Sequence, residues 1–270
     1  MRSLTLAPEP GFRSLATAVV EADDAELRKL AISIVVPCFN EEPALLSLRE
    51  RLRGMNALLS VKYDVRLVLV DDGSTDNTWL LMSDLFGAEP NCKLVRQPKN
   101  LGVAATILNG IRAADTEIVC SIDSDCTYDP RELGKLVPML TSGVDLVTGS
   151  PYHPLGEVHD VPRWRLALSK TASSLYRRVL RHKLYTYTSC FRVYRRSAIL
   201  KVDLKSGGFL GIAELIGKLE SQGSNIVECP TTLGVRAQGT SKMKVARVLL
   251  GHLYLLSQLL AARGQKRLFR

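Results

Sequence analysis

The chain has 270 residues, of which 46% are hydrophobic and 23% charged, a composition typical of a folded globular protein with a large core. This excludes collagen-like, coiled-coil and disordered proteins, and the length favours one large domain over two equal ones. The net charge of +9 is unevenly distributed: residues 1–150 hold 15 Lys and Arg against 21 Asp and Glu, whereas residues 151–270 hold 21 against 6. The basic half predicts an anionic partner.

The six cysteines form no CxxC pair and no zinc-type spacing with histidine, so we expect reduced thiols in a cytosolic protein. The N-terminal segment lacks the apolar core of a secretory signal. We therefore treat the first 30 residues, which are mixed in composition and contain Pro and Gly, as an extension.

Strands and helices alternate through the first half of the chain, as the apolar runs and the helical periodicity indicate. The expected strands cover residues 32–37, 65–72, 93–97, 117–123 and 144–149, and the expected helices cover 43–59, 103–114 and 130–140, with one more from Asp76. This alternation predicts an α/β fold with a mostly parallel sheet and helices on both faces.

The second half is expected to complete the same domain. A long loop to Pro162 is followed by a basic helix over 164–181, a strand over 191–194, a helix over 212–221 and a strand over 226–228.

Residues 245–262 form a long apolar stretch, but Arg247, His252 and Gln258 make it a poor membrane-spanning segment. The pattern favours an amphipathic helix. Such a helix lies either on a membrane interface or against its own domain or a partner subunit.

Acidic and polar residues follow three of the expected strands, at the sheet edge where parallel α/β proteins bind ligands. No GxGxxG motif follows the first strand, so this edge offers carboxylates instead of a phosphate-binding glycine loop. Because carboxylates repel phosphate, a cation has to intervene. Asp123 and Asp125, at the end of an apolar strand, supply the hard oxygen ligands that Mg²⁺ or Mn²⁺ needs to bridge a diphosphate.

The turn Asp71-Asp72-Gly73-Ser74 can be explained as an Asx turn that caps the helix after it. It also suits a second role. Asp71 at the edge of the sheet can accept the imide N–H of a pyrimidine base, which leaves Asp72 to the turn.

In their order and spacing, VVPCFNEE, VDDGSTDNT, NLGVAATILNGI and SIDSD resemble the nucleotide-sugar domain of family 2 glycosyltransferases, which have the GT-A fold. Further along, TSCFRVYRRSAIL and RAQGTSK resemble segments of dolichol-phosphate mannosyltransferases and of bacterial polyprenyl-phosphate glycosyltransferases. The resemblance covers residues 31–245.

The resemblance implies a GT-A (Rossmann-like) domain over residues 31–242, preceded by the extension over 1–30. It is followed by an amphipathic, basic C-terminal helix and tail over 243–270. It also implies an inverting, metal-dependent transfer of sugar from a nucleotide-sugar donor to a polyprenyl phosphate. The enzyme is then expected on the cytoplasmic, inner face of the membrane, held peripherally at its anionic surface, as a homo-oligomer or with a membrane subunit. With 6% aromatic residues, nucleic-acid binding is not expected.

The resemblance carries over to individual positions. Asp123, Asp125 and Thr127 match the positions that bind Mg²⁺ or Mn²⁺, and Asp125, Arg236 and Lys242 match the catalytic positions. The residues expected to contact the nucleotide sugar are Pro37, Phe39, Glu41, Leu69, Asp71, Ile122, Asp123, Ser124, Asp125, Arg236 and Lys242.

Four positions depart from the family pattern. Pro151 stands where dolichol-type enzymes have the arginine of GSRY, and Arg163 or Arg165 are candidates to replace it. Thr127 stands in place of a glutamine. At the third and fourth positions, Thr186 replaces an aspartate and Cys190 a glycine.

A lipid phosphate is already anionic at neutral pH, so its attack on the sugar requires no catalytic base. One alternative is transfer to a glycan hydroxyl, which does require a carboxylate base, and Glu214 is the candidate. A second alternative is a noncatalytic nucleotide-sugar-binding assembly subunit.

Overall fold

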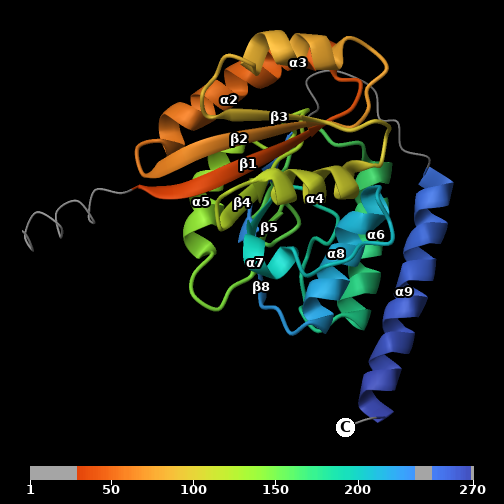
Figure 1. The fold of residues 1–270 in the computed structure, drawn as a ribbon. Coiled ribbons are helices and arrows are strands. Elements are labelled where there is room, and N and C mark those ends of the chain that lie inside the picture. Colours follow the sequence, from red (N-terminus) through yellow and green to blue (C-terminus); the bar gives the residue numbers. More distant parts are fainter. Residues whose placement is uncertain (1–28, 235–244, 269–270) are drawn as a thin grey trace, which may run out of the picture.

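The computed structural model describes residues 29–234 and 245–268, shown in colour in Figure 1; residues 1–28, 235–244 and 269–270 lie outside this description. The strands are β1 (Leu30–Cys38), β2 (Tyr63–Asp71), β3 (Cys92–Arg96), β4 (Ile118–Ser121), β5 (Leu146–Ser150), β6 (Glu157–Val158), β7 (Arg192–Arg195), β8 (Ile226–Pro230) and β9 (Thr232–Leu233). The helices are η1 (Glu42–Ala44), α2 (Leu45–Leu59), α3 (Thr78–Phe86), α4 (Val103–Ala113), η2 (Pro130–Glu132), α5 (Leu133–Leu136), η3 (Val137–Met139), α6 (Arg163–Val179), α7 (Arg196–Ile199), α8 (Phe209–Ser221) and α9 (Val245–Leu268).

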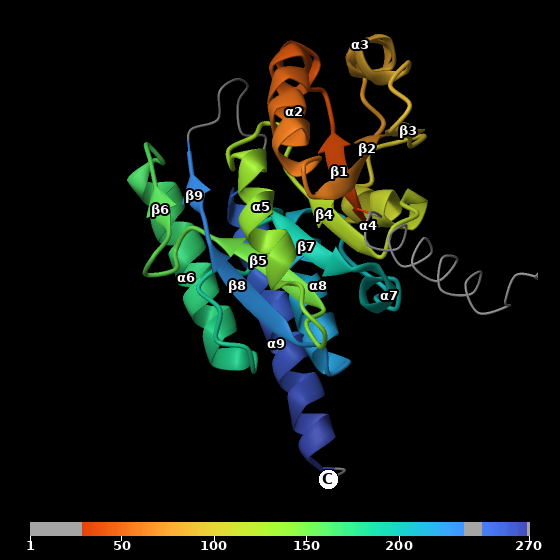
Figure 2. The same cartoon turned by 90° about the vertical axis from the view of Figure 1, so that its left-hand side faces the viewer.

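Seven strands form the central sheet in the order β3-β2-β1-β4-β7-β5-β8, and β6 pairs separately with β9. All neighbours in the large sheet are parallel except at β7, which is antiparallel to β4 and β5. Helices cover both faces (Figure 2). The prediction of a mostly parallel sheet with helices on both faces is therefore confirmed.

Strand β7 runs backwards because the loop before it returns to the edge at which β5 ends. The hydroxyls of Ser150 on β5 and Thr186 in that loop are hydrogen bonded at 2.8 Å. The N–H of Gly149 donates to the carbonyl of Phe191, also at 2.8 Å. A strand that begins where its neighbour ends has to run in the opposite direction.

Alternation along β1 sends its side chains into two cores. Ile32, Ile34 and Val36 pack on the face covered by α2, α3 and α5, whereas Val35 packs on the face covered by α4 and α8. Because helices cover both faces, β1 is buried along most of its length, which is why its sequence is apolar except at Ser33.

The helix expected over residues 130–140 is divided into η2, α5 and η3, so its continuity was predicted wrongly. The break comes at Pro138, which lies in the first turn of η3. Proline lacks the N–H that an α-helix needs at this point, and its ring clashes with the carbonyl four residues earlier.

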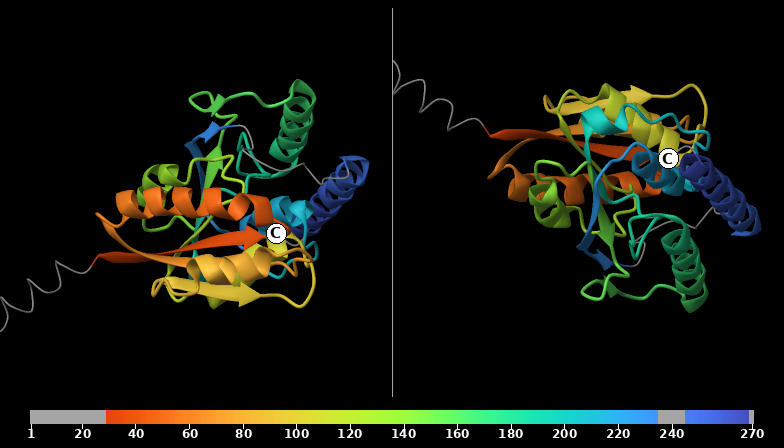
Figure 3. Two further views of the ribbon diagram at one scale, coloured as in Figure 1. Left: turned by 90° about the horizontal axis from the view of Figure 1, so that it is seen from above. Right: turned by 90° about the horizontal axis from the view of Figure 1, so that it is seen from below.

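Helix α9 packs against α6 and α8 along one side (Figures 1 and 3). His252 Nδ1 lies 2.7 Å from the hydroxyl of Tyr176 on α6, and Leu255 and Leu256 are buried in the core. The opposite side is exposed and largely apolar; it carries Leu250, Leu253, Tyr254 and Leu260, together with Ser257. None of the helices in the described ranges is long and apolar enough to cross a membrane.

The buried contact between His252 and Tyr176 makes stability depend on pH. Burial lowers the pKa of His252 below its ordinary value, so the folded chain keeps this ring neutral at a pH where the unfolded chain protonates it. We expect stability to fall as the pH drops below about 6.5, and to fall less in His252→Gln. The measurement is the free energy of urea unfolding at pH 7.5 and 5.5; equal losses in both proteins would contradict the assignment.

Candidate active site

The carboxyl ends of β2, β1 and β4 lie side by side and gather most of the residues predicted for the site. Cys38 at the end of β1 is paired in register with Asp71 at the end of β2. On the other side, the N–H of Ile122 donates to the carbonyl of Val35 on β1 at 3.1 Å. Pro37, Leu69, Asp71 and Ile122 thus occupy one edge of the sheet, as predicted.

The loops after β1 and β2 are hydrogen bonded to each other. Asn40, which has a positive φ of 52°, donates its backbone N–H to Ser74 Oγ at 2.9 Å and accepts the Thr75 N–H on its side chain at 2.8 Å. The backbone N–H of Glu41 donates to Thr78 Oγ1 at 2.8 Å. These bonds fix the half-buried Phe39 and Glu41 beside the end of β2.

The two adjacent aspartates at the end of β2 accept different hydrogen bonds. Asp71 is fully buried; its Oδ1 accepts the Ser74 N–H at 3.2 Å. Its Oδ2 lies 3.4 Å from Arg96 Nε and has no hydrogen bond from any described residue. Asp72 instead accepts the N–H groups of Leu101 and Gly102, at 2.7 and 2.9 Å. The turn bond that we expected from Asp72 therefore comes from Asp71, because Asp72 holds the loop before α4.

An open cleft of about 520 Å³ lies beside Asp71, at the ends of β2 and β3. It is lined by Gly73, Ser74, Thr75, Arg96, Gln97 and Pro98. Arg96 lies over the Trp79 ring, 5.3 Å from its centroid, next to the unsatisfied oxygen of Asp71. A buried carboxylate oxygen beside a guanidinium offers an acceptor and a donor to a flat polar ligand such as a nucleotide base.

The sequence analysis missed Arg96. The signal was available, because Arg96 lies one residue before the end of the strand predicted over 93–97, and it is the last residue of β3, at the same edge as Asp71. A basic residue at such a strand end is a ligand-binding candidate by the rule that picked out the aspartates.

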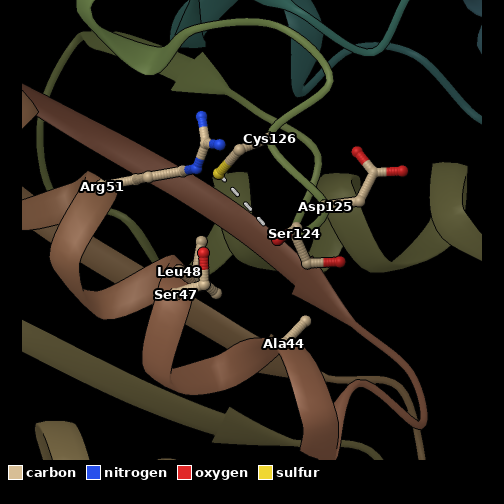
Figure 4. Close-up of a pocket in the computed structure, with 7 residues that line it drawn as sticks. All are labelled: Ala44, Ser47, Leu48, Arg51, Ser124, Asp125 and Cys126. Carbon is tan, nitrogen blue, oxygen red and sulfur yellow. Dashed lines mark hydrogen bonds between the residues drawn. The ribbon is translucent and has the colours of Figure 1, made fainter. Parts of the chain in front are cut away.

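The predicted metal-binding residues lie in the loop after β4. Asp123, Ser124 and Asp125 are half-buried, and Asp125 Oδ1 accepts the Thr127 N–H at 3.1 Å. Cys126 adopts a φ of 48°, and its N–H donates to the Asp123 carbonyl at 3.1 Å, which closes a tight turn. Figure 4 shows Ser124, Asp125 and Cys126 across a small pocket from the first turns of α2.

This loop fits a divalent cation that is shared with a substrate. Within the described ranges, no three His, Cys, Asp or Glu side chains form a group that encloses a metal by itself. Asp123 and Asp125 supply carboxylate oxygens two residues apart, and Thr127 follows in the same turn. Mg²⁺ characteristically takes one or two carboxylates and completes its shell with waters and phosphate oxygens.

Arg236 and Lys242, both predicted catalytic residues, lie outside the described residues. The chain leaves the described part next to the loop after β4, since the N–H of Gly234 donates to the Thr127 carbonyl at 2.8 Å. Leu233 forms an isolated bridge with Tyr128 in the same region.

Glu214, the candidate base for a glycan acceptor, has a structural role. Its carboxylate accepts the N–H groups of Lys205 and Ser206, both at 2.9 Å, and lies 3.0 Å from Lys218 Nζ. Burial alone would raise the pKa of Glu214, but these hydrogen bonds and the Lys218 charge outweigh burial and lower it. A carboxylate that is held ionised and saturated with donors is a poor proton acceptor.

The arrangement is similar to the crystal structure of glucosyl-3-phosphoglycerate synthase from Mycobacterium tuberculosis in complex with Mn²⁺, UDP and phosphoglyceric acid. The TM-score is 0.61 at 21% identity, and the match covers 88% of this chain and 82% of that one. At this identity the likeness concerns the fold alone. The fold is that of a GT-A glycosyltransferase, as predicted.

Comparison of sequences identifies the family of this chain. Residues 33–202 match the family model described as glycosyl transferase family 2. The chain is 30% identical over 229 residues to the dolichol-phosphate mannosyltransferase of Pyrococcus furiosus, covering 83% of this chain and 63% of that protein. It is also 30% identical over 222 residues to the polyprenol monophosphomannose synthase of Mycolicibacterium smegmatis, covering 80% of this chain and 82% of that protein.

This chain belongs to glycosyl transferase family 2, and it is therefore an enzyme. It spans less than two thirds of the length of the archaeal relative.

Removing the Asp72 carboxylate is expected to lower the stability of the protein strongly. We expect Asp72→Ala to lower the free energy of unfolding by about 3 kcal/mol, because the N–H groups of Leu101 and Gly102 would lose a charged acceptor in a buried place. Asp76→Ala is the matched control: Asp76 is exposed, accepts the Thr78 N–H, and should cost about 1 kcal/mol. Urea unfolding measures both, and equal losses would contradict the distinction.

Proposed function

We propose that this enzyme transfers a sugar from a nucleotide-sugar donor to a polyprenyl phosphate, with inversion at the anomeric carbon and with Mg²⁺ or Mn²⁺ as cofactor. The observation that carries the proposal is the placement of two features beside the two strands that flank β1. The cleft next to Asp71 lies at the end of β2, and Asp123 and Asp125 follow β4. Two strand spacings separate them by about 10 Å, a distance that a nucleoside diphosphate can span.

The base of the donor is proposed to enter the cleft that Arg96 lines beside Asp71. The unsatisfied Asp71 Oδ2 would accept a ring N–H, and Arg96 would donate to a neighbouring carbonyl. The other residues proposed to line the donor from this edge are Pro37, Phe39, Glu41, Leu69, Ile122 and Ser124.

The diphosphate is proposed to lie against the loop after β4, where Asp123 and Asp125 would hold the cation and Thr127 would add a hydroxyl or orient a water. When bound, the cation supplies positive charge that stabilises the leaving nucleoside diphosphate. Arg236 and Lys242 are proposed to contact the donor and acceptor phosphates, as their positions in the family segment imply.

The acceptor phosphate is proposed to attack without a base. Its oxygen is already ionised at neutral pH, and a single displacement opposite the leaving group inverts the anomeric centre. The saturated carboxylate of Glu214 supports this choice over a glycan hydroxyl acceptor. The names of the two relatives, which refer to dolichol and polyprenol carriers, also support it.

The exposed side of α9 supports action at a membrane surface. Leu250 and Tyr254 are 68% and 65% exposed, one helical turn apart, and the sequence after residue 262 is rich in Lys and Arg. We propose that the enzyme works on the cytoplasmic side of the membrane, attached peripherally to an anionic bilayer. A membrane subunit or a second copy of the chain is the alternative occupant of this side.

Transfer should depend on Asp125 and on a divalent cation. We expect Asp125→Ala to lower the rate at least ~100-fold, because diphosphate charge would then develop without compensation. The assay follows labelled sugar from UDP-, GDP- and related donors into organic-soluble polyprenyl phosphate, with and without EDTA. Asp129→Asn is the matched control, because Asp129 lies near the same loop but caps η2. Transfer that survives both Asp125→Ala and EDTA would contradict the metal site.

The identity of the acceptor can be tested at Glu214. Because no base is required, we expect Glu214→Gln to keep kcat within about twofold on polyprenyl phosphate. Its melting temperature should fall, since the amide is a weaker acceptor for the N–H groups of Lys205 and Ser206. A large loss of kcat in a protein that remains folded would instead favour the glycan hydroxyl.

A further inference from the structure

Helix α6 and the loops beside it form a surface in which cations lie over aromatic rings. Lys170 Nζ is 5.7 Å from the centroid of the Tyr152 ring, and the Arg177 guanidinium is 4.4 Å from that of Tyr185. His153 meets the Tyr185 ring edge-on at 5.4 Å. We name these five residues the α6 surface. Its rings orient the two cations and leave their N–H groups available to an anion.

The charge of this region is unbalanced. Residues 161–202 contain 11 Lys and Arg and no Asp or Glu. Neither Lys170 nor Arg177 forms an ion pair with any carboxylate in the described part of the chain. Such a surface attracts anions from solution.

Tyr152 is fixed close to the end of β5. Two turns hold its loop: the His153 N–H points to the Ser150 carbonyl at 3.4 Å, and the Gly156 N–H donates to the His153 carbonyl at 2.8 Å. A side chain at Gly156 would approach the Ser150 carbonyl oxygen to 2.6 Å, so the loop packs too tightly there for any residue but glycine.

The α6 surface adjoins the metal-binding loop through Tyr128. Tyr128 stacks on Phe191 with ring centroids 5.2 Å apart. Phe191 in turn lies against the end of β5, because its carbonyl accepts the Gly149 N–H at 2.8 Å. The Tyr128–Phe191 stack therefore joins the loop after β4 to the strand that Tyr152 follows.

The order of the strands separates the α6 surface from the donor. The base cleft lies at the ends of β2 and β3, Asp123 and Asp125 follow β4, and Tyr152 follows β5 on the opposite side. A diphosphate that spans the base cleft and the metal-binding loop leaves the β5 side open. A second anion would reach the sugar from that side.

We propose that Lys170, held over Tyr152, binds the phosphate of the acceptor. This inference rests on the proposed function. Arg177, seven residues further along the same face of α6, lies about 10 Å away along the helix axis, where its charge adds to the attraction of an anion.

The test compares Lys170→Gln with Arg178→Gln, which removes the same charge from an exposed position on the same helix. The acceptor is a short polyprenyl phosphate in detergent, so that attraction to a bilayer does not contribute. We expect Lys170→Gln to raise the KM for the acceptor about tenfold and to leave the KM for the donor unchanged. Arg178→Gln should leave both unchanged, and Lys170→Arg should restore most of the acceptor affinity.

The outcomes separate the two proposals. If the wild type labels the lipid and Lys170→Gln has the same acceptor KM as Arg178→Gln, the assignment of Lys170 is overturned and the proposed function stands. A rise in donor KM alone would place Lys170 at the donor diphosphate and also overturn it. A wild type that labels no lipid with any donor overturns the proposed function and this inference together. Lys170 is exposed, so none of these changes should prevent folding, and thermal melting checks this.

Discussion

The Asp72 carboxylate is the constraint on which the donor side of the site depends. It accepts the N–H groups of Leu101 and Gly102 and the side-chain amide of Gln97, and so ties the ends of β2 and β3 to the start of α4. Next to it, Asp71 keeps one buried oxygen without a hydrogen bond from any described residue. A buried acceptor costs free energy unless a partner reaches it, so this oxygen marks the place where a ligand has most to contribute.

On the other side of the sheet, a buried and a half-buried carboxylate hold the loop between α6 and β7. Glu220 accepts the N–H of His182 at 2.8 Å, and Glu228 accepts the N–H groups of Tyr185 and Thr186. The fully buried Arg192 donates to the carbonyls of Tyr187 and Ile212, which joins the same loop to α8. These charges are compensated by backbone dipoles, and they fix α6 at the side of the sheet where an acceptor would arrive.

Much of this arrangement could be predicted from the sequence, because strand periodicity and strand-end carboxylates are local signals. These signals are sufficient to place Asp71, Asp123 and Asp125 at one edge of the sheet. The direction of β7 could not be predicted, since it depends on a hydrogen bond between Ser150 and Thr186, 36 residues apart. The same is true of Lys170: Arg163 and Arg165 are closer in sequence to Pro151, but two turns of helix bring Lys170 over Tyr152.

The two sides of helix α9 face different environments. Its inner side completes the core through the Tyr176 hydroxyl and through Leu259, whose side chain fills the space that Gly217 leaves on α8. Its outer side is largely apolar and exposed. The helix is therefore no detachable module: a recombinant enzyme shortened before residue 245 would expose part of its own core, and a different anchor could be grafted there only if it reproduced the inner contacts. Changes to the outer side, by contrast, are free of this constraint, so the enzyme could acquire a new attachment by surface substitutions alone.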